Sequence, residues 1–143
     1  MKPHAKVWPE PPQLALPENP AFVSHCDSAW LAYEIADGID NTYAVIRFDG
    51  LIDFHMSPIN DEGLGLHPYA RTGIKPYEFN ELFGTSELQK WADLETRQFA
   101  ITFKDVTIDI IARTAFVLHR GFACVDAHTA LLTVARSPFQ SGG

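Results

Sequence analysis

The sequence predicts an α+β fold with a mainly antiparallel sheet and one or two helices packed on one face. The segments that alternate apolar and polar residues occur as adjacent pairs, and a segment with helical spacing lies between them. Strands that follow one another directly favour antiparallel pairing over a βαβ arrangement. The 143 residues, 46% hydrophobic and 20% charged, are enough for one core. We expect a proline-rich arm over residues 1–20, one domain over 21–136 and a flexible tail over 137–143.

The N-terminal arm is defined by six of the ten prolines in the chain, Pro3, Pro9, Pro11, Pro12, Pro17 and Pro20. Proline removes a backbone donor and restricts φ, so neither a helix nor a central strand fits there. The apolar residues Trp8, Leu14 and Leu16 favour an arm that lies along the body or along a second subunit.

Residues 28–36 alternate in a way that suits a strand with one buried face. A helix that ends at Gly38 is the competing interpretation, because alanine, leucine and glutamate favour helices. We favour the strand, because residues 37–41 then form a turn into a second β-rich segment.

The clearest local signal is Asp49-Gly50 between the β-rich runs 42–48 and 51–56, which predicts a hairpin with a type I′ turn. One face of this hairpin is then expected in the core, with Tyr43, Val45, Ile52, Phe54 and Met56. The other face is mixed and ends in Asp53 and His55.

The second half of the chain begins with a long loop over residues 57–75. Loops of this length without secondary structure more often have a function than not. Residues 76–95 have helical spacing in two pieces, the second capped by Thr85 or Ser86. Residues 97–118 alternate as strands with a turn at Lys104-Asp105. Residues 126–136 fit either a helix capped by Asp126 or a last strand.

The net charge of −7 is concentrated between residues 21 and 70, which contain eight acidic residues and one basic residue. The rest of the chain contains ten acidic and ten basic residues. An acidic front half with no basic stripe elsewhere argues against nucleic-acid binding. The acidity suits a basic protein partner, or it serves solubility alone.

Targeting signals and cysteine patterns are also absent from the sequence. No apolar stretch approaches the roughly 18 residues of a membrane span, and we expect no signal peptide and no membrane partner. Cys26 and Cys124 match no redox or zinc pattern, which favours reduced thiols in a cytoplasmic protein unless the fold pairs them.

No phosphate-binding loop, dinucleotide fingerprint, nucleophile elbow, HExxH or EF-hand pattern is present. We therefore predict no catalytic residue, no cofactor and no metal. Candidate binding residues are Asp53, His55, Asp61, Glu62, His67 and Tyr69.

Among these candidates, Asp53 and His55 share one face of a strand, and His67 follows in the long loop. An Asp and a His on one face can form a general base with its orienting group, or two ligands of a metal whose third ligand is His67. The competing interpretation is a polar, solvent-facing strip of the sheet.

Two hypotheses for function follow. The first is a non-catalytic interaction or regulatory module, a homodimer formed through its sheet or arm. The alternative is a small ligand-binding protein or enzyme with a pocket near Asp53 and His55 under residues 57–75. Whether the chain has enzymatic activity stays open, although no catalytic motif supports it.

Overall fold

The computed structural model describes residues 2–15, 19–60 and 62–141, with only the backbone described for 135–141. These residues form a seven-stranded antiparallel sheet with two α-helices, so the predicted α+β class is confirmed. The strands are β1 His4–Val7, β2 Ala21–His25, β3 Ser28–Glu34, β4 Thr42–Ser57, β5 Phe79–Phe83, β6 Arg97–Thr102 and β7 Thr107–Ala123. The helices are α1 Ser86–Lys90 and α2 Ala127–Ser141, with 3-10 turns η1 Leu64–Leu66, η2 Ala70–Thr72 and η3 Ala92–Leu94.

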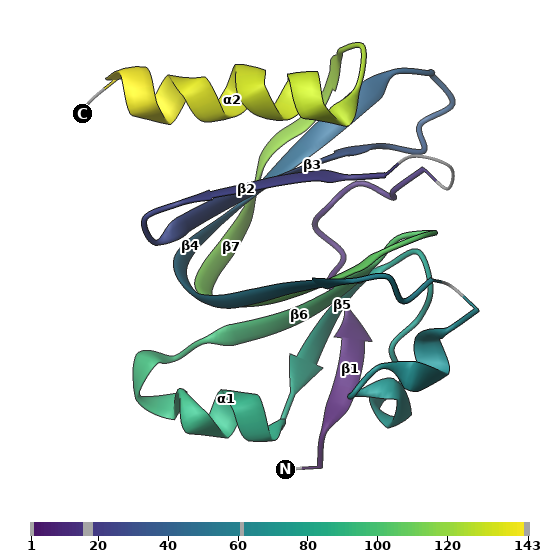
Figure 1. Cartoon of the computed structure of the whole chain (residues 1–143), viewed down its shortest axis with the longest axis vertical. Helices are drawn as coiled ribbons and strands as arrows, with labels where there is room; N and C mark the ends of the chain where they lie inside the picture. The colour runs from purple at the N-terminus through teal and green to yellow at the C-terminus, as the bar shows by residue number, and fades with distance from the viewer. Residues whose placement is uncertain (1, 16–18, 61, 142–143) are drawn as a thin grey trace.

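The sheet folds into two layers because its two central strands, β4 and β7, are long and bend together (Figure 1). The strand order is β1-β5-β6-β7-β4-β3-β2. The first half of β4 pairs with β3 up to Asp49, which forms the upper layer with β2. The first half of β7 pairs with β6 over residues 107–112, which forms the lower layer with β5 and β1.

The hairpin predicted at Asp49-Gly50 is wrong, because β4 runs without a turn through both residues. The partner of this strand is β7, some sixty residues later, which pairs along the whole length of β4. Gly50 has φ +65°, and the register shifts between Leu51 and Asp53, so the dipeptide forms a bend with a bulge.

The predicted core face of residues 43–56 is accordingly only half right. Tyr43 and Val45 are buried, but beneath α2 on the outer face of the sheet. Phe54 and Met56, beyond the bend, are 41% and 45% exposed. Before the bend, the residues of the inner core are Ala44, Ile46 and Phe48.

Replacing Gly50 with alanine is expected to destabilise the protein by at least about 1–2 kcal/mol, the cost of a left-handed backbone for a residue with a Cβ. A Cβ at this position would also lie 2.7 Å from Cγ of Arg113. Urea denaturation measures the loss, with Gly65→Ala as the control, because a Cβ there meets nothing within 4 Å. Equal stability of the two variants would contradict the strained bend.

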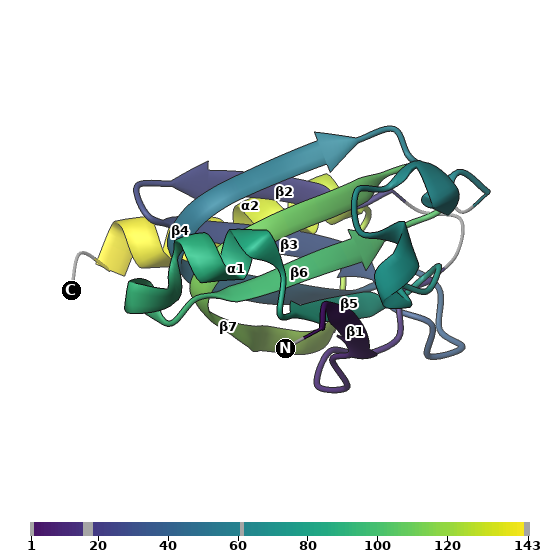
Figure 2. The same cartoon turned by 90° about the horizontal axis from the view of Figure 1, so that it is seen from below.

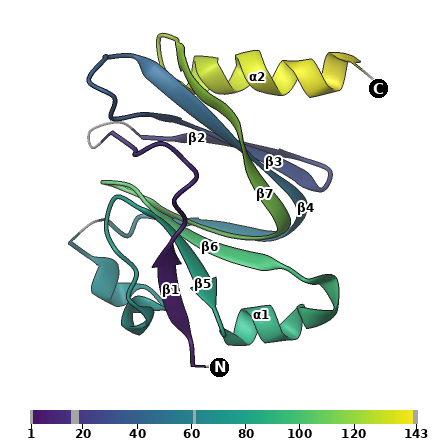
Figure 3. The ribbon, with the colours of Figure 1, turned by 180° about the vertical axis from the view of Figure 1, so that it is seen from behind.

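The main core lies between the two layers, and the N-terminal segment contributes to it. Trp8 and Leu14 are buried, and residues 8–15 run from β1 to the upper layer across one open side of the sandwich (Figure 3). Leu14 bridges to Ile35, and the Tyr33 hydroxyl donates a hydrogen bond to the Pro12 carbonyl at 2.8 Å. Leu16 lies outside the described residues.

A second core lies on the outer face of the upper layer, beneath α2. Buried side chains of this core are Trp30, Ala32, Tyr43, Val45, Ala127, Ala130, Leu131 and Val134. The Asp126 carboxylate accepts a hydrogen bond from the Thr129 backbone N–H at 2.7 Å, which lowers the pKa of Asp126. Residues 126–136 therefore take the helical alternative, and α2 continues into the segment expected as a tail, with residues 142–143 outside the description.

The helix predicted over the first part of residues 76–95 is wrong. Residues 79–83 form β5, which pairs with β1 on one side and β6 on the other. The strand is favoured because it buries Phe79 in the main core, where its ring lies 5.0 Å from that of Tyr33. The second piece is confirmed as a short helix, α1, whose N-cap Thr85 accepts a hydrogen bond from the Leu88 N–H.

Residues 28–34 form a strand rather than a helix, and residues 97–102 and 107–123 are strands joined by a turn at Lys104-Asp105. Cys26 and Cys124, both within the described chain, are free thiols. None of the described helices combines the length and apolar character that crossing a membrane requires.

Candidate functional site

The candidate site is a cavity of about 280 Å³ on the outer face of the lower layer. It lies between β4, β6 and β7, the start of α1, and the segment that follows β4. Its wall is made of Asp53, Phe54, His55, His67, Pro68, Tyr69, Glu87, Gln98, Asp109 and Ile111.

The pairing of β4 with β7 and β6 creates the floor of this cavity. His55 lies opposite Asp109, and Asp53 lies opposite Ile111, which in turn faces Gln98 on β6. Residues that lie opposite each other on antiparallel strands present their side chains on the same face. The floor therefore combines two carboxylates, an imidazole and an amide with one buried isoleucine.

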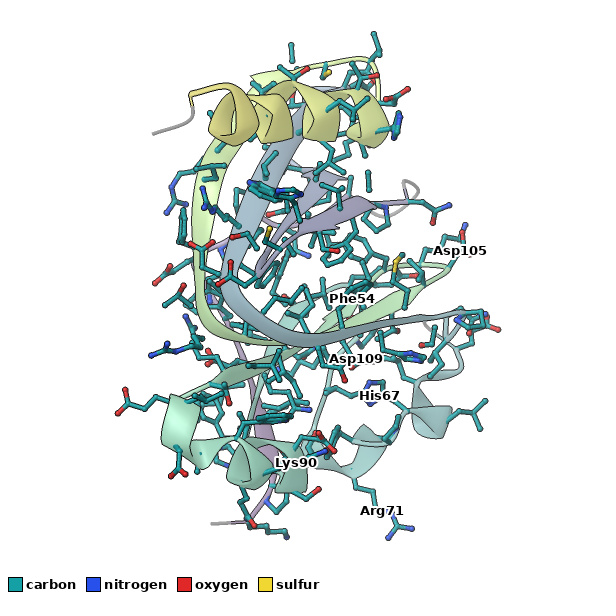
Figure 4. The ribbon with its side chains drawn as sticks, turned by 60° about the vertical axis from the view of Figure 1, so that its left-hand side comes forward. Phe54, His67, Arg71, Lys90, Asp105 and Asp109 are labelled. Carbon is teal, nitrogen blue, oxygen red and sulfur yellow. The ribbon has the colours of Figure 1, made fainter. Side chains whose placement is uncertain are left out.

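The roof is attached to the floor by a hydrogen bond between His67 and Asp109, whose side chains point toward each other (Figure 4). Nε2 of His67 lies 2.7 Å from Oδ1 of Asp109, and the His67 side chain is only 1% exposed. Nδ1 accepts a hydrogen bond from the Tyr69 N–H at 3.0 Å, so the proton sits on Nε2 and is donated to the carboxylate.

Further buried polar side chains of the lower layer hold the same segment. The Thr107 hydroxyl donates to the Ile59 carbonyl, and the Thr102 hydroxyl donates to the Lys75 carbonyl. Asn80 bonds both the N–H and the carbonyl of Lys75. Residues 59–75 are thus fastened at both ends and in the middle, which accounts for most of the buried polar residues of this layer.

Helix α1 supplies the remaining side of the cavity. Thr85, fully buried, donates a hydrogen bond to the Gln98 side-chain carbonyl. This bond joins the N-terminus of α1 to the floor and places Glu87, in the first turn, in the cavity wall.

The bonding of His67 limits the chemistry of the site. Both of its ring nitrogens are occupied, so it has no free lone pair with which to abstract a proton or bind a metal. Within the described residues, no three His, Cys, Asp or Glu side chains are placed to hold a metal ion. The arrangement can enclose and orient a small molecule, and we find no nucleophile paired with a base among its wall residues.

The structure brings together four of the six residues singled out from the sequence: Asp53, His55, His67 and Tyr69. Glu62 is exposed and does not line the cavity, and Asp61 lies outside the described residues.

Sequence reasoning missed Glu87, Gln98 and Asp109 as wall residues. A signal exists for Asp109, which is an acid within the apolar alternation of residues 106–111. That Asp109 lies beside His55 follows only from the pairing of β4 with β7, and these two strands are far apart in the sequence.

Several acids of the front half are engaged locally. Asp49 forms an ion pair with Arg47 at 2.9 Å and accepts a hydrogen bond from Ser28. Asp37 and Glu34 accept backbone hydrogen bonds within the β3–β4 turn. These contacts are typical of acids that stabilise turns and strand ends.

The chain was compared with protein families, curated proteins and solved structures. The chain matches no family model, no curated protein and no solved structure.

Proposed function

We propose that the chain is a ligand-binding protein that takes a small organic amine in the cavity beneath residues 57–75. The observation that carries this proposal is the charge of the cavity wall. Asp53, Glu87 and Asp109 contribute carboxylates, and none of the described wall residues is lysine or arginine. Such a wall attracts a cation and repels phosphates and carboxylates.

The apolar part of the wall supports an organic ligand over a bare ion. Tyr69 contributes an aromatic ring, and Pro68 and Ile111 contribute aliphatic surface. An ammonium group is stabilised by aromatic faces as well as by carboxylates, and an apolar body fills the space between them. The hydrogen bonds that hold residues 59–75 support a cavity formed before the ligand arrives.

A thermal-shift experiment with two probes of the same shape tests the sign of the charge. We expect 2-phenylethylamine at millimolar concentration to raise the melting temperature and phenylacetate to leave it unchanged, because a ligand stabilises the state that binds it. Glu87→Gln is expected to reduce the amine shift, whereas Glu95→Gln, exposed and outside the wall, retains it. No shift with the amine, or an equal shift with phenylacetate, would refute the proposal.

We also propose a second candidate function, the interaction module, because beyond Leu51 the strand β4 pairs with β7 alone among the described strands. In this proposal the chain is a homodimer, and the proline-rich arm and the helices on one face support the sheet that dimerises. A cytoplasmic location and a basic protein partner, drawn by the acidic front half, belong to the same proposal.

A further inference from the structure

The second half of β4 is an unpaired sheet edge. Beyond Leu51 the strand pairs with β7 on one side, and no described strand covers its other side. Figure 2 shows this part of β4 at the margin of the lower layer. Such an edge presents a row of free backbone donors and acceptors to another strand.

The remaining edges of the sheet are short or protected. β1 has four residues, of which Lys6 is exposed, and β2 has five. The second half of β7 carries two arginines whose guanidinium groups bond neighbouring segments: Arg113 donates to the Leu94 carbonyl and Arg120 to the Glu10 carbonyl. Lysines, short strands and covering segments are the usual means of preventing edge pairing.

The β4 edge has no such protection and carries exposed apolar side chains. Phe54 and Met56 are 41% and 45% exposed, and both lie on the inner face of the sheet, opposite Ile110 and Ile108. The ring of Phe54 meets Phe22 of β2 at 4.8 Å on one side.

We propose that the occupant of this edge is a second copy of the chain, which pairs antiparallel about a two-fold axis at Phe54. In this register Phe54 lies opposite Phe54 of the second copy, and Ile52 opposite Met56. Asp53 then lies opposite His55, and the same contact occurs twice by symmetry. A carboxylate and an imidazole N–H form a hydrogen bond whether or not the imidazole is charged.

The charges of the strand select this register over its neighbours. A two-fold axis at Asp53 would place two carboxylates opposite each other, and an axis at His55 would place two imidazoles opposite each other. Like groups directly opposed across strands are destabilising. Only the axis at Phe54 pairs unlike groups on one face and apolar groups on the other.

The dimer also brings the two cavities together, since Asp53 and His55 belong to the cavity wall. Each site would then be completed at its β4 side by the second copy. This dimer rests on the interaction-module proposal and not on the identity of the ligand, because the unpaired half of β4 supports it and the cavity does not.

Sedimentation equilibrium of the full chain over a range of concentrations tests the proposal. The wild type is expected to reach twice the 16.0 kDa of one chain. His55→Asp places two carboxylates opposite each other in both contacts, so we expect the dissociation constant to rise by about tenfold. The exchanged variant Asp53→His/His55→Asp restores the unlike pairs and is expected to dimerise like the wild type.

The control is His119→Asp, the same charge change at an exposed histidine on β7, which is expected to leave the dimer intact. Circular dichroism of each variant verifies that the fold is retained. A monomeric wild type would overturn the proposal, as would a His55→Asp dimer of unchanged strength. An exchanged variant that stays monomeric would overturn the register.

Discussion

Replacing Trp8 with alanine is expected to lower the free energy of unfolding by about 3–5 kcal/mol, the usual cost of removing a large buried aromatic side chain. The indole is 5% exposed, and its ring lies 5.0 Å from that of Phe99 and 6.3 Å from that of Phe79. The guanidinium of Arg97 covers it at 5.3 Å. A loss of this size is a large fraction of the 5–15 kcal/mol that stabilises a typical domain.

Urea denaturation followed by circular dichroism measures this loss, with Trp91→Ala as the matched control. Trp91 is only partly buried and ends the short helix α1, so its replacement is expected to cost much less. The midpoint should fall with little change in the m-value if the native core is otherwise retained. Equal losses for the two tryptophans would mean that residues 8–15 do not seal the core.

The N-terminal segment is part of the main core. Trp8 and Leu14 were singled out from the sequence as apolar anchors of an arm, and the structure places both among the buried residues of the main core. The backbone N–H of Trp8 donates a hydrogen bond to the Phe79 carbonyl at 2.8 Å, so the segment continues the edge of the lower layer. A truncation that removes it would unfold the chain rather than test an interface.

The strands themselves could be predicted because alternation of apolar residues is a local property. It identified residues 28–34, 42–48 and 97–102 correctly. The choice of partner could not be predicted in the same way. Asp49-Gly50 has the residue types of a tight turn, yet the same positive φ at Gly50 serves a bulged bend when a distant strand pairs along both sides of it.

The candidate site was half predictable for a related reason. The two-residue spacing of Asp53 and His55 places them on one face of any strand, and the length of the 57–75 loop marked the segment that covers them. Asp109 became part of the site only through the β4–β7 register. His67 was considered as a third ligand, whereas its two hydrogen bonds make it a structural link between loop and sheet.

The link between His67 and Asp109 leads to the second large effect. We expect His67→Ala to lower the free energy of unfolding by about 1.5–3 kcal/mol, the range for a hydrogen bond to a charged group. The substitution removes the bond at 2.7 Å and the one from the Tyr69 N–H, and it leaves the middle of the loop without its attachment to β7. Limited proteolysis within residues 58–75 is expected to accelerate as a result.

A double-mutant cycle separates the bond from the rest of the side chain. If the two residues act through each other, Asp109→Ala costs a similar amount, and the double variant costs less than the sum of the two by about 1 kcal/mol or more. Asp109→Asn keeps an oxygen that accepts the Nε2–H and is expected to lose less than Asp109→Ala. His128→Ala, at an exposed position on α2, is the control and should change stability by no more than about 0.5 kcal/mol.

Strict additivity in the cycle would show that His67 and Asp109 stabilise the protein separately, and the cavity would then lack a fixed roof. Non-additivity together with faster cleavage of the loop would show that one hydrogen bond holds the roof over the floor. In that case His67→Ala should also abolish the thermal shift produced by 2-phenylethylamine, because Tyr69 and Pro68 would no longer be held against the wall that carries Asp53 and Glu87. Retention of the full shift in an otherwise folded variant would contradict this coupling between the loop and the ligand site.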